Sequence, residues 1–520
     1  MGIIINKFGE LVNGVIKGFD RIVFKGMLRP IMFASGMQSH LMSQGVLNKD
    51  FKTYAQATSK AIVAGAEETS KLHTSNPIIY ISSSNERKEI LAHKHQEQSN
   101  INEGLIGVWS CVESCLTYRS AFNPQSTYPE LRHERSRCKH LYFYMDDPTY
   151  GFMSIRLQTW APYEIQIALN GREWLRRSLD SVGCTYVLHG NKFLHIDDYE
   201  LAQKFLDAQL EADFVNILNG FVPMVFPIMP EILPNMSYYW TLWQSELAAD
   251  YIFDKTESLN PLMDDLMRYA LITGNGERIL KYFGRPVKAN GQPYPNSNPE
   301  ILSRTKIWYD GLRVRHWNGK NSVKFYNEHN VLRFEMTMND PSKYKIHRHA
   351  ENQDKSEPKK LMPIRKGIAD ITARAKVSKG IVDRFTEHMA SFEETTSLEE
   401  LISTVSSPLV KNGKRIRALD VFGKDLQFIR AISDPAFAVS GITNKELQKI
   451  LIDSTWAKDK NTKQLSGKIT RHLALFRKHG IIKKLPNQRK YELTDKGRKL
   501  TTAVNVALAA PVNSLLKLAA

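Results

Sequence analysis

The sequence predicts an α+β protein of several domains, in which a central antiparallel sheet with helices precedes a C-terminal helix-turn-helix unit with a β-wing. Its 520 residues correspond to three or four domains of about 150 residues each. Alternating apolar runs separated by turn residues fill the middle of the chain, and helical spacing followed by two short strands ends it. Hydrophobic residues at 42% and charged residues at 24% exclude a collagen-like, coiled-coil or wholly disordered chain.

The first region, residues 1–135, is expected to be α/β. The run DRIVFKGML, which begins at Asp20, has apolar residues at alternating positions and predicts a strand. A mixed helical tract continues to about Glu89, and PIIYISS within it predicts a second strand.

The second region, residues 136–300, is expected to hold a meander followed by a helical segment. Three runs separated by turn residues predict antiparallel strands: HLYFYMDD, FMSIRLQTW and EIQIALNG. GREWLRRSLDSVG then has helical spacing and a glycine stop. The same spacing predicts helices over two later segments: MSYYWTLWQSELAADYIFD and SLNPLMDDLMRYALITGNGERILKYFG.

Four regions are expected after residue 300. A basic β-rich segment, 301–350, completes the body through hairpin-connected strands. The polar stretch 351–365, rich in helix and strand breakers, predicts a linker or mobile loop. A helical connector at 366–440 then leads to the last domain, 441–520.

Positive charge is segregated along the chain. The formal charge is +17, from 71 Lys plus Arg and 54 Asp plus Glu. Residues 303–384 hold 19 basic and 9 acidic side chains, and residues 441–500 hold 16 and 5, so the rest of the chain is slightly acidic. Concentrated positive charge is what phosphate binding requires, and we therefore expect a nucleic-acid partner. Ordinary solvated charged faces are the alternative for either window alone.

The last domain carries the most specific pattern. It reads as two helices, two short strands and a third helix, and the second helix has one apolar face and one basic, hydroxyl-bearing face. Such a helix fits a major groove. The segment LFRKHGIIKKLPNQRKYELTDKGRKL resembles the winged helix of MarR-type and ArsR-type regulators, which implies binding of DNA or structured RNA. Protein contact or packing by the same module is the alternative.

Two sets of residues are expected to contact nucleic acid, since basic and hydroxyl side chains bind phosphates and base edges. In the last domain they are Lys463, Ser466, Lys468, Thr470, Arg471, Lys483, Lys484, Arg489 and Lys490. In the basic β-rich segment they are Arg313, Arg315, Lys320 and Lys324.

Carboxylates on or beside predicted strands are candidates for metal-dependent phosphodiester chemistry. Nucleases need two or more carboxylates on a hard cation, which would be Mg²⁺ or Mn²⁺ if this chain is a nuclease. The candidates are Asp20, Asp146, Glu164 and Glu335. Glu335 is the strongest, because it lies on an apolar strand with Arg333 two residues away on the same face. A structural Arg–Glu pair is the alternative.

Residues 322–339 also resemble the tyrosine-containing strand pair of phage and plasmid replication initiator nickases. The resemblance implies Tyr326 as a nucleophile and Glu335 as a metal ligand, with Arg333 and Lys324 stabilising charge. The chain departs from one large nickase class, since its histidine pairs flank Lys94 and Arg348 and not an apolar residue. A half-buried sheet tyrosine is the alternative.

A zinc site is a further hypothesis. Its weak candidate ligands are Cys111, Cys115, Cys138 and His140, with the first two expected on one helical face. The spacing differs from that of zinc ribbons and fingers, so buried cysteines are the alternative. The sequence contains no phosphate-binding GxxxxGK[ST], no GxGxxG after a strand and no HExxH, so ATP or NAD use is not expected.

The chain as a whole resembles a group of large uncharacterised bacterial proteins, on the evidence of DRIVFKG, NGREWL and the terminal domain. We expect a nucleic-acid-processing protein of a mobile element or defence system, or alternatively a non-enzymatic transcriptional regulator or RNA-binding protein. Four cysteines and an N-terminus unlike a signal peptide favour the cytoplasm, and no membrane segment is expected. A homodimer is a further expectation, since such regulators are normally dimeric.

Overall fold

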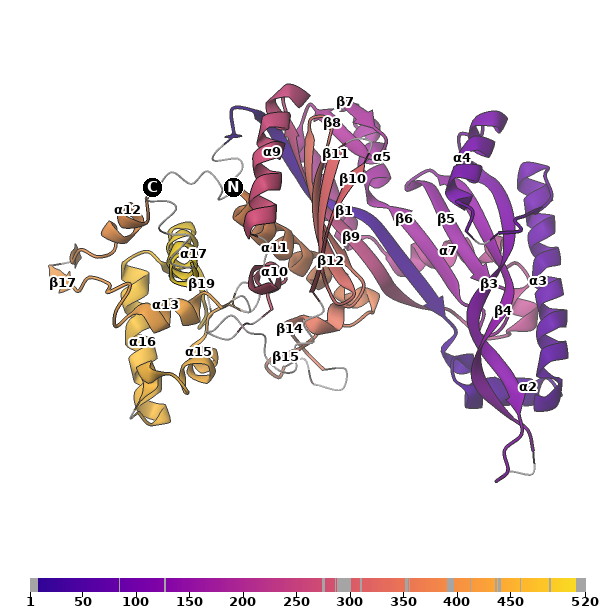
Figure 1. Ribbon diagram of the computed structural model, residues 1–520. Coiled ribbons are helices and arrows are strands. Elements are labelled where there is room, and N and C mark those ends of the chain that lie inside the picture. The colour runs from indigo at the N-terminus through magenta and orange to yellow at the C-terminus, as the bar shows by residue number, and fades with distance from the viewer. Residues whose placement is uncertain are drawn as a thin grey trace.

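A computed structural model of the chain describes most of its residues (Figure 1). The described ranges are 8–83, 85–125, 128–273, 276–285, 287, 301–308, 311–350, 354, 356–390, 397–411, 413–434, 437, 441–458, 460–485 and 488–510. Most of the predicted loop before residue 301 and part of the predicted linker at 351–365 lie outside them. No helix in these ranges is long and apolar enough to cross a membrane.

One large sheet organises the body, and the predicted α+β class is confirmed. Its strand order is β10-β11-β12-β13-β9-β1-β6-β5-β4-β3-β2. The strands are β1 (Val12–Met27), β2 (Ile79–Tyr80), β3 (Gly104–Ala121), β4 (Glu130–Asp147), β5 (Gly151–Gln158), β6 (Ile165–Asn170), β9 (Tyr239–Phe253), β10 (Ile301–Trp308), β11 (Gly311–Asn318), β12 (Asn321–Glu328) and β13 (Val331–Met338). All neighbours are antiparallel except β2 and β3, so the sheet is mixed and not purely antiparallel.

The two faces of this sheet differ in chemistry. Side chains alternate between faces along each strand, so the strand register assigns every residue to one face. One face holds the main hydrophobic core, in which Phe24, Phe334 and Phe143 lie. The other face, here called the polar face, carries the aligned residues Lys324 and Glu335 on β12 and β13.

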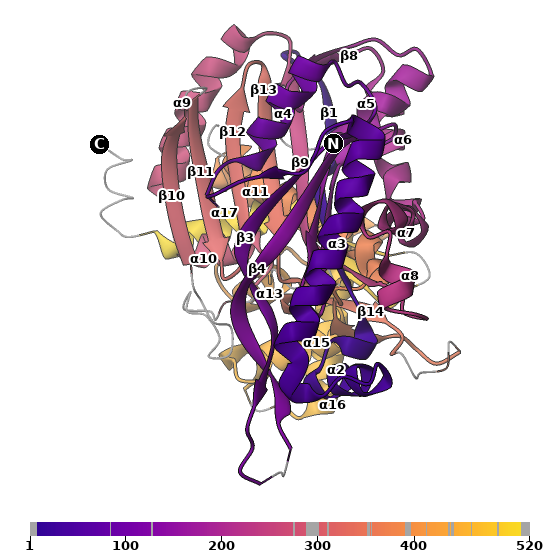
Figure 2. The same ribbon diagram turned by 90° about the vertical axis from the view of Figure 1, so that its right-hand side faces the viewer.

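Helices cover the core face. Figure 2 shows α3 (Phe51–Thr74) lying along β3 and β4. At the other end, Phe385 of α11 (Ile371–Ala390) packs against the rings of Phe325 and Phe334. The remaining helices of this layer are α2 (Ala34–Ser43), α7 (Phe214–Val225), α8 (Met229–Ile232), α9 (Thr256–Thr273) and α10 (Gly276–Tyr282).

Two small modules pack on the polar face. Helix α4 (Lys88–Ser99) packs on β3. The second module comprises α5 (Gly171–Ser181), β7 (Tyr186–His189), β8 (Lys192–Ile196) and α6 (Tyr199–Ala208). It packs on β1, where a Cβ at Gly18 would lie only 2.9 Å from the Leu206 side chain of α6. The small residue therefore allows the close approach of helix and strand.

Residues 239–253 differ from the prediction, because they form β9 and not a helix. β9 lies in the middle of the sheet between β1 and β13, and most of its residues are buried on both faces. A continuous apolar run of this kind resembles a buried helix in sequence. Cys111 and Cys115, expected on a helical face, likewise lie on a strand, β3.

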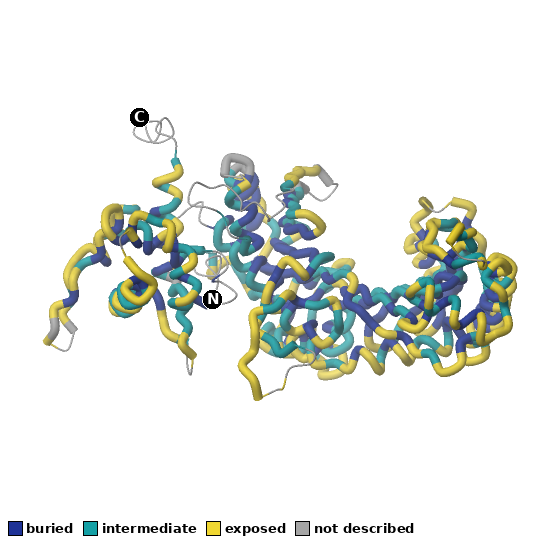
Figure 3. Tube along the Cα trace, turned by 90° about the horizontal axis from the view of Figure 1, so that it is seen from below, coloured by how far each residue is buried: buried dark blue, intermediate teal, exposed yellow. Residues whose placement is uncertain are grey.

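The C-terminal residues form a unit with its own hydrophobic core, built around Ile469, Leu473 and Phe476. Figure 3 shows buried stretches inside this unit and again along the sheet. Its elements are α12 (Leu398–Ser403), β16 (Leu409–Lys411), β17 (Lys414–Ile416), α13 (Leu426–Ile432), α15 (Asn444–Leu451), α16 (Thr462–Lys478), β18 (Ile482–Lys484), β19 (Tyr491–Leu493) and α17 (Asp495–Ala509). A separate two-stranded pair, β14 (Lys345–Arg348) and β15 (Lys360–Pro363), lies at the edge of the body.

Candidate active site on the polar face of the sheet

Three carboxylates from three neighbouring strands meet on the polar face. Asp20 of β1, Glu246 of β9 and Glu335 of β13 each offer an oxygen, and these oxygens lie within 4.8 Å of one another. β9 lies between the other two strands, which brings together residues more than 300 positions apart in sequence. We call these three residues the carboxylate cluster.

A β-bulge brings Asp20 into the cluster. The pairing of β1 with β9 shifts between Phe19 and Arg21, so that Arg21 lies opposite Glu246 while Phe19 lies opposite Leu247. The extra residue at a bulge redirects a side chain. Asp20 consequently accepts hydrogen bonds from Arg333 (3.1 Å) and Asn191 (2.7 Å), both of which reach the polar face.

Asp250 lies four residues after Glu246 on β9, on the same face and beside the cluster. It binds two buried arginines. Arg333 donates to both of its oxygens, at 2.5 and 2.8 Å. Arg172 lies 2.8 Å from it, and all three residues are 1% exposed. Burial alone would raise the pKa of Asp250, but the charges of Arg333 and Arg172 lower it overall. Asp250 therefore remains ionised and holds the two arginines in place.

The start of helix α5 supplies Arg172. Asn170 caps this helix by accepting hydrogen bonds from the backbone N–H groups of Arg172 (3.0 Å) and Glu173 (3.2 Å). Gly171 follows the cap, and a Cβ there would lie 2.1 Å from the Phe19 carbonyl oxygen of β1. Only glycine permits the helix to begin this close to β1. The predicted turn into a helix at NGREWL thus delivers a buried cation to the cluster.

Within the cluster the two glutamates have different surroundings. Lys324 of β12 lies 2.7 Å from Glu335, which is 1% exposed. Glu246 accepts a hydrogen bond from the Gln244 amide (2.6 Å) and forms no salt bridge within the described residues. Burial raises the pKa of Glu246, and the negative charge of Glu335 raises it further. Burial and the neighbouring negative charge therefore both disfavour the ionised form of Glu246.

Tyr326 lies next to the cluster, opposite Arg333 on β13. Its ring is 4.3 Å from the Arg313 guanidinium and 5.5 Å from the Lys324 ammonium. Burial raises the pKa of its hydroxyl, so the phenol is neutral near pH 7. The residues of the nickase-like segment that were predicted to act together, Tyr326, Arg333 and Glu335, are all adjacent in space.

The other predicted acids lie elsewhere. Asp146 accepts hydrogen bonds from Arg177 (2.5 Å) and from the Gln96 amide (3.1 Å) of α4. Glu164 forms an ion pair with Lys25. Neither belongs to the carboxylate cluster: Asp146 lies on β4, which β5, β6 and β1 separate from β9, and Glu164 precedes β6 and lies outside the strands.

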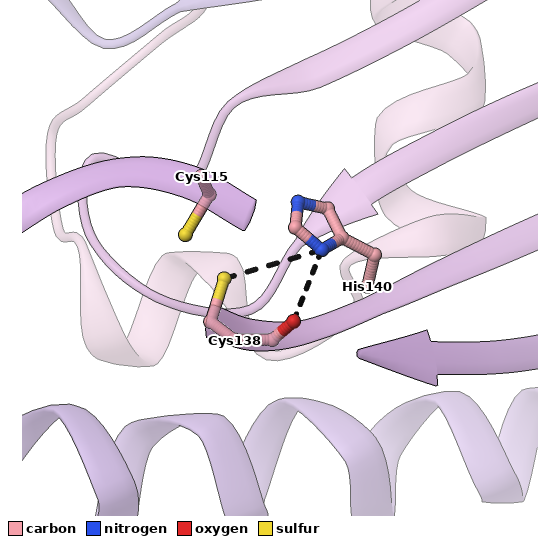
Figure 4. A group of neighbouring side chains, drawn as sticks. All are labelled: Cys115, Cys138 and His140. Atoms are coloured by element: carbon pink, nitrogen blue, oxygen red, sulfur yellow. Dashed lines mark hydrogen bonds between the residues drawn. The ribbon is translucent and has the colours of Figure 1, made fainter. Parts of the chain in front are cut away.

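A second group of candidate ligands forms on β3 and β4. Cys115, Cys138 and His140 are buried, with ligand atoms within 4.8 Å of one another (Figure 4). Cys111, the fourth predicted ligand, instead donates a hydrogen bond to Glu113 (3.2 Å). Burial lowers the pKa of His140 to about 4, so its imidazole is neutral near pH 7.

The predicted nucleic-acid contacts of α16 divide into two groups. Lys468 donates to the Trp456 carbonyl (2.8 Å) and lies 3.7 Å from that ring's centroid, and burial lowers its pKa. Ser466 and Thr470 donate to Asn444 Oδ1 (3.1 Å) and to the Ser466 carbonyl (3.0 Å). The exposed members of the predicted set are Lys463, Arg471, Lys483, Lys484 and Arg489.

The predicted contacts of the basic β-rich segment line the polar face beyond the cluster. Arg315 donates to Ser322 Oγ (2.8 Å) and lies 4.8 Å from the Trp317 ring centroid. Lys320 is exposed at the turn between β11 and β12. Arg313, Arg315 and Lys324 point to the same face, because the register pairs Arg313 with Tyr326 and Arg315 with Lys324.

Family models, curated proteins and solved structures were all compared with this chain, and none matches it. The chemistry of the site is therefore inferred from its geometry.

Two of the central acids, Glu246 and Asp250, were absent from the predicted site. Both are charged residues spaced four apart within an apolar run, and residues at this spacing on a strand share one face. That signal becomes visible only once residues 239–253 are assigned as a strand. Arg172 could have been found as a charged residue on the apolar side of an amphipathic helix, since it lies in the same helical row as Leu175 and Leu179.

Proposed function

We propose that this protein binds nucleic acid and carries out divalent-metal-dependent phosphodiester chemistry at Asp20, Glu246 and Glu335. The single observation that carries the proposal is the convergence of these three carboxylates within 4.8 Å from three different strands. Mg²⁺ and Mn²⁺ prefer such oxygen ligands, and a bound cation can polarise a phosphodiester and generate hydroxide from water.

The charges around the cluster support a cation there. Asp250 neutralises much of the charge of Arg172 and Arg333, and Lys324 pairs directly with Glu335 while only partly offsetting the charge of Glu246. Glu246 then bears a negative charge that burial and Glu335 both disfavour. A divalent cation would relieve this repulsion by bridging Glu246 to its neighbours.

Incomplete hydrogen bonding is a further feature of this group. Arg172 is 1% exposed, yet its Nε and Nη1 atoms have no hydrogen-bond partner within the described part of the chain. Structural networks in protein interiors are normally satisfied, and exceptions concentrate at functional sites.

Basic side chains on the same face would attract the substrate's phosphates. Arg313, Arg315 and Lys324 lie on consecutive strands that approach the cluster from the β11 side, and Lys320 is exposed at the turn beyond them. Lys192 of β8 approaches from the other module and lies 5.7 Å from the Tyr326 ring. Such a row neutralises a phosphate backbone and gives salt-dependent affinity.

The C-terminal unit would dock the substrate as a winged helix. Its order is α15, α16, the hairpin β18–β19 and α17, and β19 also pairs with Ile442 ahead of α15. This order is typical of a helix-turn-helix with a β-wing. Lys463 and Arg471 are exposed on α16, and Lys483, Lys484 and Arg489 are exposed on or beside the hairpin.

Cleavage assays on the full chain test the proposal. Labelled single-stranded and double-stranded DNA and RNA are incubated with and without Mg²⁺ or Mn²⁺. We expect metal-dependent cleavage that falls by at least about 100-fold in Glu246→Gln and Glu335→Gln, as expected when metal ligands are lost. Glu164→Gln is the matched control, because this partly buried glutamate just before β6 pairs with Lys25 outside the cluster.

A non-enzymatic binding protein is the second candidate, and the ion pairs of the cluster favour it. Asp20 and Glu335 already have cationic partners at 3.1 and 2.7 Å. In that case every substrate stays intact with both metals while retention remains tight and salt-sensitive. Affinity that did not change between low and moderate salt would contradict both candidates.

A further inference from the structure

The long hairpin of β3 and β4 encloses a second cluster with different chemistry. Cys115 lies on β3, and Cys138 and His140 lie two residues apart on β4. They are 4%, 3% and 0% exposed. Their ligand atoms lie within 4.8 Å of one another, and no carboxylate belongs to the group.

His140 has a nitrogen free to accept a ligand bond. Its Nδ1 lies 3.2 Å from the Cys138 carbonyl oxygen and 4.0 Å from the Cys138 sulfur, and the carbonyl contact suits an Nδ1–H donor. Its Nε2 is buried without a hydrogen-bond partner within the described residues. Figure 4 shows the nitrogen-bearing edge of the ring turned toward the two sulfur atoms. Metal-binding imidazoles are normally held by a hydrogen bond from their other nitrogen, which leaves Nε2 of His140 as the ligand atom.

We propose that Cys115, Cys138 and His140 bind a zinc ion that links β3 to β4. Two thiolates and one imidazole are soft and borderline donors, which select Zn²⁺ over Mg²⁺ or Ca²⁺. Binding releases the two thiol protons to solvent and forms two Zn–S bonds and one Zn–N bond. The two thiolate charges balance the charge of the ion, and a water molecule completes the tetrahedron.

A disulfide fits the same residues less well. The register pairs Cys115 with Ser136 and Cys138 with Glu113, so the two cysteines are diagonal and not directly opposite. Diagonal neighbours on antiparallel strands lie about 7–8 Å apart, with their Cβ atoms somewhat closer. A disulfide requires Cβ atoms about 3.5–4.5 Å apart. A metal ion spans the larger separation through two bonds of about 2.3 Å.

Zinc content of the purified full-length protein tests the proposal. After loading with zinc and removal of free ion, elemental analysis should find one zinc per chain. Cys115→Ser and Cys138→Ser should each lower the occupancy at least about tenfold at limiting free zinc. Cys111→Ser is the matched control, since it alters a buried cysteine on the same face of β3 that hydrogen-bonds to Glu113 instead. Retention of one zinc in both ligand variants, or no zinc in the wild type, would overturn the proposal.

Spectroscopy of the wild-type chain keeps the test independent of variant folding. Co²⁺ added to metal-free protein should give an intense thiolate-to-cobalt absorption that Zn²⁺ abolishes, and zinc should protect Cys115 and Cys138 from alkylation while Cys184 still reacts. Titration with Cu⁺ forms the competing arm: if Cu⁺ binds at the two cysteines and Zn²⁺ neither binds nor protects them, the zinc assignment is wrong. An intact mass lower by two hydrogens that reductant restores would instead identify a disulfide.

Discussion

The carboxylate cluster and the Cys/His cluster lie on the same face of one sheet but differ in donors, exposure and origin. The first joins Asp20, Glu246 and Glu335 from three strands far apart in sequence, with cations packed among them. The second joins two thiols and one imidazole from a single hairpin, and all three side chains are buried. Hard oxygen donors beside a row of basic residues favour a reactive cation and a phosphate, whereas enclosed sulfur donors favour a structural ion.

The largest expected effect concerns Asp250, which supports the first cluster. Asp250→Asn leaves the buried Arg172 and Arg333 with Asp20 as their one remaining shared carboxylate among the described residues, so we expect a loss of about 3–5 kcal/mol in the free energy of unfolding. Chemical denaturation followed by tryptophan fluorescence measures it. Asp146→Asn is the control, because its partner Arg177 is 28% exposed and the loss should be below about 1 kcal/mol. Equal losses in the two variants would contradict the central role of Asp250.

Substitution of Glu246 should weaken metal binding while stabilising the metal-free protein. In metal-free protein, Glu246→Gln should raise the thermal unfolding midpoint, because it removes a buried charge whose pKa is raised. Glu335→Gln should lower the midpoint, because Lys324 loses its counter-ion. The penalty from Glu246 is complete above its raised folded-state pKa and disappears as the pH falls below its ordinary value of 4.5. The gain in Glu246→Gln should therefore shrink on acidification, and a gain that grew instead would contradict this account.

Zinc should stiffen only the hairpin that encloses the second cluster. Hydrogen exchange at the backbone amides around Cys115 and Cys138 should slow by about tenfold or more when zinc binds, because opening the hairpin then requires loss of the ion. Exchange around Glu246 and Glu335 should stay unchanged. Slowing of both regions to the same extent would show that the two clusters are not independent.

The smallest expected effect lies on α16. Arg471→Ala should weaken nucleic-acid binding and reduce the salt dependence by about one counter-ion, because this exposed side chain is free to contact a phosphate. Lys468→Ala should change the salt dependence less and lower stability instead, since Lys468 is held by Trp456. Salt titrations of binding, paired with thermal unfolding, distinguish the two. An equal reduction of the salt slope in both variants would contradict the division.

Local patterns predicted much of the fold, and the failures have a physical origin. The meander of β4, β5 and β6 and the helices and strands after residue 441 follow from alternation, helical spacing and turn residues. Residues 239–253 were expected to be helical because a strand buried on both faces loses its alternation. The pairing of β9 with both β1 and β13 is a long-range property that no local pattern contains.

The candidate site was accordingly predicted only in part. Asp20, Glu335 and Tyr326 were chosen as charged or reactive groups on apolar strands, and the strand order brings them together. Glu246 and Asp250 were missed with their strand. Cys115, Cys138 and His140 were recognised by residue type, but Cys111, which lies opposite His140 in the register, donates to Glu113 and stands outside the group.

Binding of Mn²⁺ to the zinc-saturated full chain tests the central claim most directly, with electron paramagnetic resonance reporting the free ion. We expect one Mn²⁺ per chain in the wild type and in Glu164→Gln, and at least about a tenfold weaker affinity in Glu246→Gln, the variant expected to be the more stable in its metal-free form. No Mn²⁺ bound by the wild type, or equal affinity in Glu246→Gln, would contradict a cation site at Asp20, Glu246 and Glu335.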